Sequence, residues 1–201
     1  MQILVDVRLL SKGGRTGIEE YTRQIVSRLV QSQKHNFLLF YNAFRKQPLG
    51  LKGKVIDWRI PNKIFDLWRP NIDKFFDVDL VYSPHINILN TKNKPRILTI
   101  HDLSFMHFPY FFSWKHRYWH FLQNIRQQTQ KAAAIVANSQ YTKNDIAETL
   151  NIPPEKIHYI YPGIDPGLKK IDQKRPANLS FPFLLYLGTL EPRKNIPAVI
   201  E

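Results

Sequence analysis

The stretch Arg96-Ile97-Leu98-Thr99-Ile100-His101-Asp102-Leu103 decides the fold class. Its apolar residues form a short run of the kind that fills a strand buried within a parallel sheet. His101 and Asp102 follow at the carboxyl end of this strand, the edge at which open α/β sheets hold their ligands. A histidine is versatile near pH 7 and a neighbouring carboxylate can orient it, but the same residues can also simply cap a loop. The pattern leaves both interpretations open.

Working outward from this strand, strand and helix patterns alternate along the chain. This alternation predicts an α/β fold, a Rossmann-like parallel sheet with helices on both faces. The other predicted strands are Ile3–Val7, Phe37–Tyr41, Val55–Ile56, Asp79–Ser83, Ala134–Ala137 and Ile157–Tyr161. The predicted helices are 18–32, Ile64–Trp68 as a helical turn, one capped by Ser113, and one from the cap Ser139 through Leu150.

The composition changes after the last of these strands. Residues 164–182 are rich in proline and lysine and are interpreted as a linker that follows a first domain, 1–163. Phe183–Leu187 is then predicted as a strand, and Asn195 is predicted to cap a helix. Residues 183–201 are therefore expected to begin a second domain, so that the chain is the front part of a longer protein.

Composition excludes several classes of protein. The 201 residues are 43% hydrophobic, enough to bury a core, so wholesale disorder is excluded. The absence of cysteine rules out disulfides, thiolate metal sites and cysteine nucleophiles. No apolar stretch is long enough to span a bilayer, and the N-terminus is typical of a strand rather than of a signal peptide. A cytoplasmic protein is expected.

The formal net charge of +13 predicts an anionic partner. Nucleic acid, a phosphorylated small molecule and an anionic membrane surface all satisfy this condition. The basic residues are scattered and match no recognised DNA- or RNA-binding motif, which disfavours nucleic acid.

Two turns that each join a strand to a helix are candidate anion sites. In Gly13-Gly14-Arg15-Thr16-Gly17-Ile18, glycine lets the backbone approach a ligand, a helix N-terminus presents free N–H groups, and Arg15 adds a cation. In Gly188–Asn195, the adjacent cations Arg193 and Lys194 suit a diphosphate. An ordinary glycine turn and a solvated basic turn are the alternatives.

Aromatic residues are concentrated in Leu103–Leu122, with basic side chains and histidines between them. Such a segment can lie on a membrane, bind an amphiphilic acceptor or stack bases. The helical spacing of Trp114, Tyr118 and Phe121 instead favours a helix that turns its aromatic residues toward the core. His116 and His120 lie four residues apart, but they lack the third ligand that a metal site needs, and no metal is expected.

Taken in order, five segments resemble the family 4 glycosyltransferases, retaining enzymes with the two-domain GT-B fold. The segments are Gly17–Tyr21, Thr99–Leu103, 137–143, Ile160–Asp165 and Tyr186–Asn195, and the last is most similar to a branch with many mannosyltransferase-like members. The resemblance covers essentially the whole chain.

The resemblance implies transfer of a hexosyl group, mannosyl-like, from a nucleotide-diphosphate sugar to a glycan or lipid-linked acceptor. The first domain would bind the acceptor, with Arg15 and Thr16 as contacts, and Gly17 would approach the donor phosphate. His101 and Asp102 are the expected catalytic residues, His101 lying beside the transferred sugar. Arg193 and Lys194 would hold the donor diphosphate. Many family members have an arginine where this chain has Thr189, so Arg193 is expected to supply that charge.

The resemblance also implies independence of metal ions and cofactors. The family's Glu-x7-Glu element is absent from this sequence, so we expect the 201 residues alone to be inactive. A non-catalytic sugar- or phosphate-binding module is the alternative function, and a nucleic-acid-binding protein is a weaker one. The basic first half is compatible with peripheral docking at the inner face of the cell membrane.

Overall fold

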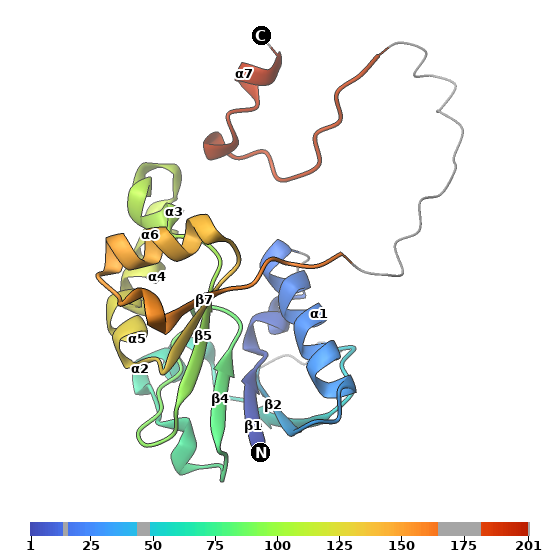
Figure 1. The fold of residues 1–201 in the computed structure, drawn as a ribbon, viewed down its shortest axis with the longest axis vertical. Helices are drawn as coiled ribbons and strands as arrows, with labels where there is room; N and C mark the ends of the chain where they lie inside the picture. Colours follow the sequence, from blue (N-terminus) through green and yellow to red (C-terminus); the bar gives the residue numbers. More distant parts are fainter. Residues whose placement is uncertain (14–15, 44–48, 165–181, 201) are drawn as a thin grey trace.

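Seven parallel strands form one sheet in the order β3-β2-β1-β4-β5-β6-β7 (Figure 1). The computed structural model describes residues 1–13, 16–43, 49–164 and 182–200. The strands are β1 (Gln2–Asp6), β2 (Asn36–Asn42), β3 (Lys54–Trp58), β4 (Leu80–Ser83), β5 (Arg96–Ile100), β6 (Ala134–Ala137) and β7 (Ile157–Tyr159). The predicted fold class, a Rossmann-like parallel sheet, is confirmed.

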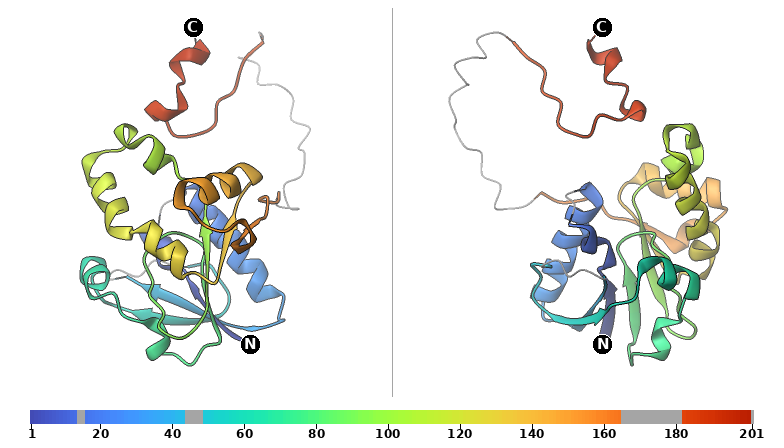
Figure 2. Two further views of the ribbon diagram at one scale, coloured as in Figure 1. Left: turned by 60° about the vertical axis from the view of Figure 1, so that its left-hand side comes forward. Right: turned by 180° about the vertical axis from the view of Figure 1, so that it is seen from behind.

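Helices cover both faces of this sheet (Figures 1 and 2). The α-helices are α1 (Gly17–Gln31), α2 (Asn62–Trp68), α3 (Ser104–His107), α4 (Trp114–Gln123), α5 (Ile125–Lys131), α6 (Gln140–Leu150) and α7 (Pro197–Ile200). The short 3-10 helices are η1 (Arg8–Lys12), η2 (Ile72–Lys74), η3 (Pro109–Phe111), η4 (Pro154–Lys156) and η5 (Pro192–Lys194). In the part of the chain that the structure describes, no helix is both long and apolar enough to cross a membrane.

The core explains the apolar run Ile3–Val5 at the centre of β1. Ile3 and Val5 pack with Val26 of α1 on one face of the sheet. Leu4, between them in sequence, packs with Phe65 of α2 on the other face. Successive side chains of a strand point to opposite faces, so the centre of a strand covered on both sides carries consecutive apolar residues.

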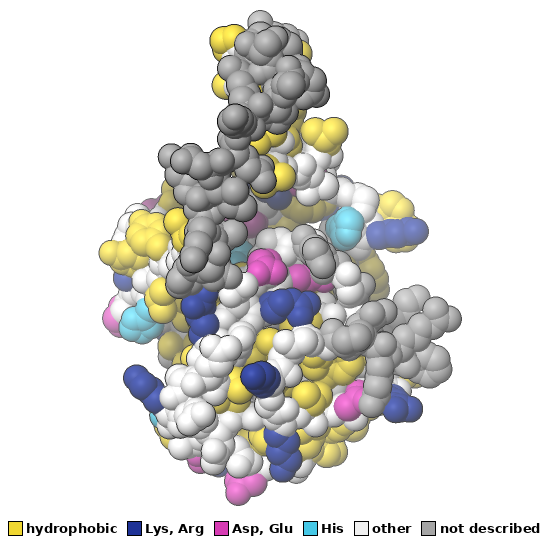
Figure 3. Space-filling model, turned by 90° about the vertical axis from the view of Figure 1, so that its right-hand side faces the viewer, with side chains coloured by type: hydrophobic (Ala, Val, Ile, Leu, Met, Phe, Trp, Pro, Cys, Tyr) yellow, Lys and Arg dark blue, Asp and Glu magenta, His cyan; other side chains and the backbone are white. Residues whose placement is uncertain are grey.

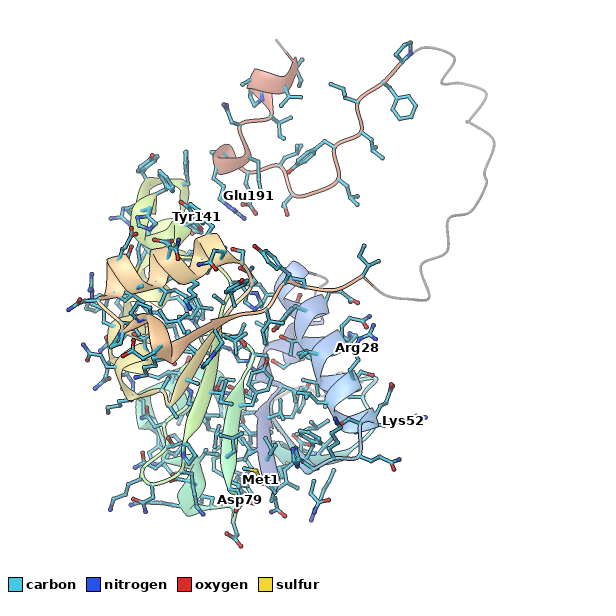
Figure 4. All side chains as sticks on the ribbon, viewed as in Figure 1. Met1, Arg28, Lys52, Asp79, Tyr141 and Glu191 are labelled. Carbon is cyan, nitrogen blue, oxygen red and sulfur yellow. The ribbon has the colours of Figure 1, made fainter. Side chains whose placement is uncertain are left out.

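The chain changes direction across the sheet at β1. From β1 it continues outward through β2 and β3 on one side, and β4 to β7 then extend the sheet on the other. The carboxyl ends of β1, β4 and β5 are therefore neighbours at the point where open α/β sheets form a ligand crevice. Figure 4 shows Tyr141 near this carboxyl edge, whereas Met1 and Asp79 lie at the opposite edge.

Residues 104–123, which comprise α3, η3 and α4, form a helical segment that we call the aromatic arm. It lies on the outer side of the molecule, away from α1 (Figure 2). Asn124 joins the arm to α5 without an intervening loop. Its left-handed backbone, at φ 45°, ends α4, and its side chain accepts a hydrogen bond from the Gln127 backbone N–H that begins α5.

The expectation that Trp114, Tyr118 and Phe121 face the core is wrong. Trp114, Tyr118 and Phe121 are 72%, 58% and 78% exposed. The helix instead turns Gln123 into the protein, and His120 stacks on Phe105 with 4.1 Å between ring centroids. Helical spacing establishes that the three residues share a face, but not that another element covers it.

The predicted strand at 183–187 does not form in the described residues. The backbone there is irregular, and Leu184, Leu185 and Leu187 are more than 80% exposed. A strand needs neighbouring strands for its backbone N–H and C=O groups, and the sheet of the described residues ends at β7 without pairing to 183–187. The division into domains at 163 and 183 stays a prediction, because residues 165–181 lie outside the described part.

Candidate functional site

His101 lies at the carboxyl edge of the sheet, directly after β5, as predicted. Its Nε2 atom is 3.0 Å from the carbonyl oxygen of Pro84, which follows β4. The Tyr21 ring of α1 meets the imidazole edge-on, with 4.7 Å between centroids. Thr142, in the first turn of α6, donates a hydrogen bond to the His101 carbonyl oxygen. Segments from four parts of the chain therefore fix this histidine.

The contact with Pro84 determines which nitrogen of the His101 ring carries the proton. A carbonyl oxygen can only accept a hydrogen bond, so Nε2 donates and the neutral ring keeps a lone pair on Nδ1. Burial lowers the pKa of His101, although the Pro84 carbonyl and Asp102 act in the opposite direction. His101 at neutral pH is therefore a hydrogen-bond acceptor through Nδ1.

The predicted partner of His101, Asp102, has a local structural contact. Its Oδ1 atom accepts hydrogen bonds from the backbone N–H and the hydroxyl of Ser104, at 3.0 and 2.6 Å. These bonds start α3 in the way that a helix cap does. Asp102 is exposed, and its carboxylate is engaged with Ser104 rather than with the imidazole.

The N-terminus of α1 also lies at this edge, since Tyr21, one turn into the helix, contacts His101. Thr16 caps the helix: its hydroxyl accepts from the Glu19 N–H, and the Glu19 carboxylate accepts from the Thr16 N–H at 2.8 Å. A Cβ atom added at Gly17 would meet no atom within 4 Å. The fold therefore does not require glycine at position 17.

Beneath the edge lies a buried polar cluster that the sequence analysis did not identify. Arg8 donates two hydrogen bonds to the Asp6 carboxylate, at 2.9 and 2.7 Å, and another to the Ile88 carbonyl oxygen. His85 Nε2 lies 3.7 Å from Asp6 Oδ1. Burial alone would raise the pKa of Asp6, but Arg8 and His85 together lower it below its usual range.

This cluster ties β1 to the segment that follows β4. His85 is itself kept neutral, because burial lowers its pKa to about 4. The segment held in this way includes Pro84, whose carbonyl orients His101. A signal was present in the sequence, since Asp6 and Arg8 directly follow the apolar run of β1. No such signal marked His85. Tyr21 and Thr142 lie in the segments Gly17–Tyr21 and 137–143 that resemble the family, but neither was predicted as a site residue.

The remaining predicted site residues are not brought to His101 by any described contact. Arg15 lies outside the described residues. Arg193 and Lys194 form η5 in segment 182–200, where the Arg193 guanidinium pairs with the Glu191 carboxylate at 2.5 Å. Within the described ranges, no group of three or more His, Asp or Glu side chains is arranged to hold a metal ion.

Comparisons with known proteins found a family model, a relative and a solved structure that are similar to this chain. The model of Glycosyltransferase Family 4 matches residues 15–168. The O-antigen chain mannosyltransferase RfbU of Salmonella typhimurium is 29% identical over 128 residues, which are 64% of this chain and 33% of that protein. A crystal structure of a glycosyltransferase from Rickettsia africae matches 82% of this chain and 43% of its own, with 17% identity and a TM-score of 0.46.

The chain spans about a third of the length of RfbU, so the two are similar over a part of that protein only. The family model, by contrast, matches most of this chain, including α1, all the strands from β2 to β7, and His101. The chain therefore belongs to Glycosyltransferase Family 4.

Proposed function

We propose that the chain supplies the acceptor-side domain of a retaining glycosyltransferase. The enzyme would move a hexosyl group, mannosyl-like, from a nucleotide-diphosphate sugar to a glycan or lipid-linked acceptor. The observation that carries this proposal is the fixed, neutral His101 at the carboxyl edge of the sheet. The mannosyltransferase activity in the name of RfbU supports mannose as the sugar.

The geometry of His101 suits recognition of a sugar. A hexose presents hydroxyl groups, and each hydroxyl can donate one hydrogen bond. Nδ1 of His101 can only accept, since Nε2 holds the proton for the Pro84 carbonyl. We therefore assign His101 to a hydroxyl of the transferred sugar. Tyr21 and Pro84 hold the ring in place, so little side-chain entropy is lost on binding.

The donor diphosphate is assigned to two groups of donors. The first is the N-terminus of α1 at Gly17, where backbone N–H groups and the helix dipole favour an anion. The second is Arg193 with Lys194. Glu191 holds Arg193 through Nε, and a guanidinium has five N–H groups, so donors remain for a phosphate.

Arg15 and Thr16 are assigned to the acceptor as part of this proposal. Thr16 keeps its cap while doing so, since a hydroxyl oxygen that accepts from Glu19 still has a hydrogen to donate. The proposal also includes independence of metal ions, with basic side chains in place of a divalent ion. It places the protein on the cytoplasmic side, peripheral to an anionic membrane.

A transfer assay on the longest reading frame that contains this chain tests the proposal. We expect label to pass from GDP-mannose, or another nucleotide-diphosphate hexose, to a glycan or lipid-linked acceptor in the presence of EDTA. NMR of the product should show the anomeric configuration of the donor retained. Inversion of configuration, or a strict need for a divalent metal, would contradict those parts of the proposal.

Variants of two histidines connect that activity to the site. His101→Ala is expected to lower kcat/KM about tenfold to hundredfold, because it leaves a sugar hydroxyl without its acceptor. His35, an exposed histidine before β2, provides the matched control, and His35→Ala should leave kcat/KM unchanged. Equal activity of the two variants would remove His101 from the site.

The 201-residue chain alone is expected to bind ligands but not to turn them over. If it binds a nucleotide-diphosphate sugar or a glycan without transfer, and the longer reading frame transfers, the chain is the acceptor half of the enzyme. If neither protein transfers any sugar, a binding module becomes the better account of the fold. Turnover by the 201 residues themselves would contradict the expectation.

A further inference from the structure

The outer face of α4 carries large apolar side chains that no described element covers. Trp114, Tyr118 and Phe121 follow one another at i, i+4 and i+7, so they form one stripe along the helix. All three are more than half exposed. We call them the outer stripe. A soluble protein gains nothing from holding such residues in water, and contiguous exposed apolar surface marks an interaction site.

The charges around the outer stripe have one sign. Lys115 and Arg117 flank it on its two sides, and Lys115 Nζ lies 5.8 Å from the centre of the Trp114 ring. Residues 103–143 include five Lys or Arg side chains and no Asp or Glu. The carboxylates that contact the arm bind α3, Asp102 at Ser104 and Asp145 at His107. Helix α4 itself combines an aromatic face with cations and no acidic residue, which is the composition of helices that lie in a membrane interface.

A cleft of about 690 Å³ opens beside the outer stripe, between the end of α2 and the helices of the arm. Three arginines line it, namely Arg69, Arg117 and Arg126, together with the apolar side chains of Phe105, Phe112 and Phe121. Arg69 is fixed there, since its Nη2 donates to the Leu122 carbonyl oxygen at 3.0 Å. Guanidinium groups suit phosphate oxygens, and the phenylalanines suit the carbon part of an amphiphile.

We propose that the aromatic arm docks this chain on an anionic phospholipid bilayer. The outer stripe enters the interface, where Trp and Tyr are the favoured side chains. Lys115 and Arg117 lie against headgroups, and the three-arginine cleft receives the phosphate of one lipid. This inference rests on the proposed function, which places the protein at an anionic membrane. It adds which surface of the chain binds the membrane, how that surface is oriented, and which lipid group it binds.

Charge and shape favour a bilayer over the other partners of an aromatic, basic surface. A single-stranded nucleic acid is held in a basic groove whose aromatic side chains stack successive bases. Here the aromatic side chains stand on the convex outer side of a helix, with cations beside them. On the α1 side of the molecule, Lys and Arg are dispersed among other residues, and no continuous basic track is seen there (Figure 3).

Docking through the arm has a consequence for the site. The arm begins three residues after His101, where Ser104 starts α3. A bilayer that holds the arm would therefore hold the carboxyl edge of the sheet close to its surface. An acceptor anchored in the same bilayer would reach His101 without leaving the interface.

Vesicle flotation of the 201-residue chain tests the proposal. Vesicles of phosphatidylcholine are compared with vesicles of equimolar phosphatidylcholine and phosphatidylglycerol. We expect the wild-type chain to partition at least tenfold better onto the anionic vesicles. Trp114→Ala with Phe121→Ala should lower that partitioning at least tenfold, because the aromatic residues no longer enter the interface. Circular dichroism melting shows whether each variant is folded.

A charge-matched pair of variants separates the arm from net charge. Arg117→Gln with Arg126→Gln removes two cations from the cleft, and Lys34→Gln with Lys52→Gln removes two exposed cations elsewhere. Each cation near the surface contributes about fivefold to binding. We expect the arm pair to reduce partitioning more than tenfold and the control pair to reduce it less than threefold. Equal losses would overturn the arm as the docking surface.

Trp114→Phe adds a readout that is independent of affinity. Phenylalanine preserves the apolar stripe, so this variant should bind vesicles as the wild type does. Brominated lipid should quench part of the wild-type tryptophan fluorescence, and that part should be lost in Trp114→Phe. No difference in quenching would mean that the stripe stays in water, and the proposal fails.

Two further outcomes identify a different explanation. If a single-stranded oligonucleotide binds more tightly than the vesicles and Trp114→Ala with Phe121→Ala abolishes that binding, the surface is a nucleic-acid site. If no vesicle binds but the longer reading frame transfers sugar to a soluble glycan, the docking proposal fails and the proposed function stands. If the chain binds vesicles but the longer reading frame transfers no sugar, the docking proposal stands and the proposed function fails.

Discussion

Arg8 and Arg117 both lie beside phenylalanine rings, yet they occupy opposite environments. Arg8 is 6% exposed, stands 4.5 Å from the centre of the Phe65 ring, and is paired with the Asp6 carboxylate. Arg117 is exposed on the aromatic arm and lines an open cleft with Phe121. The same residue types therefore complete a core in one region and remain available for a partner in the other. Burial and pairing, rather than composition, distinguish the two.

Arg8→Met should have the largest effect on stability. It leaves the Asp6 carboxylate buried without its counter-charge, which costs about 3–5 kcal/mol. Arg117→Met changes an exposed side chain, so the free energy of unfolding should change by less than about 0.5 kcal/mol. Urea unfolding followed by circular dichroism measures both. Similar losses would mean that the arm is as tightly integrated as the buried cluster.

The pH dependence of stability also distinguishes the buried cluster from the aromatic arm. Burial holds the pKa of His85 at about 4 in the folded protein, whereas an unfolded histidine titrates near 6.5. The unfolded chain therefore binds the extra proton first, and stability should fall as pH decreases from about 6.5 to about 4, by about 3 kcal/mol. Below that window, protonation of Asp6 removes further stability, since its pKa lies below the usual value.

His85→Gln should flatten the fall in stability between pH 6.5 and 4. Burial also lowers the pKa of His120 on the arm to about 4, but His120 is only partly buried. His120→Gln should therefore remove a smaller part of the slope. Unfolding midpoints measured across this pH range compare the two variants. If His120→Gln flattened the slope more than His85→Gln, the pH dependence could not be assigned to His85.

Loss of a helix cap should cost more stability at α1, beside the buried cluster, than at α4 on the exposed arm. Thr16 caps α1 together with the buried Glu19, and Thr16→Ala is expected to cost about 1–2 kcal/mol. Ser113 caps α4 on the exposed arm and accepts from the His116 N–H at 3.4 Å. Ser113→Ala should cost about 0.5 kcal/mol. Thermal unfolding of the two single variants gives the comparison.

The outer stripe should contribute least to stability. Trp114→Ala and Phe121→Ala remove side chains that are already in water, so each should change the free energy of unfolding by less than about 0.5 kcal/mol. A change of this size, together with a large loss of vesicle binding, would show that the stripe serves a partner rather than the fold. Loss of the folded state in either variant would show instead that α4 needs these side chains.

The sequence predicted the elements that carry strong local signals. The strand Ala134–Ala137 and the helix that follows the cap Ser139 agree with the structure, because an apolar run marks the strand and the serine marks the helix start. The sequence also contains the signature of the capping box, a threonine at 16 followed three residues later by Glu19, but Thr16 was predicted only as an acceptor contact.

Other features depend on contacts between distant segments, and no local pattern contains them. The spacing of Trp114, Tyr118 and Phe121 is the same whether or not a neighbour covers them. The predicted strand at 183–187 requires partner strands, and the described residues provide none for it. At the site, His101 was found from its position after a strand, whereas the contact of Tyr21 with it arises only when α1 packs on the sheet.

Asn124 limits how the arm can be altered. Because this one residue both ends α4 and caps α5, no flexible joint absorbs a change in helix length. Inserting a single residue between Phe121 and Asn124 would turn Trp114, Tyr118 and Phe121 about 100° around the helix axis and shift them about 1.5 Å along it. The number of residues in α4 therefore sets the direction in which the aromatic face points. To keep that direction, residues must be added or removed in whole helical turns.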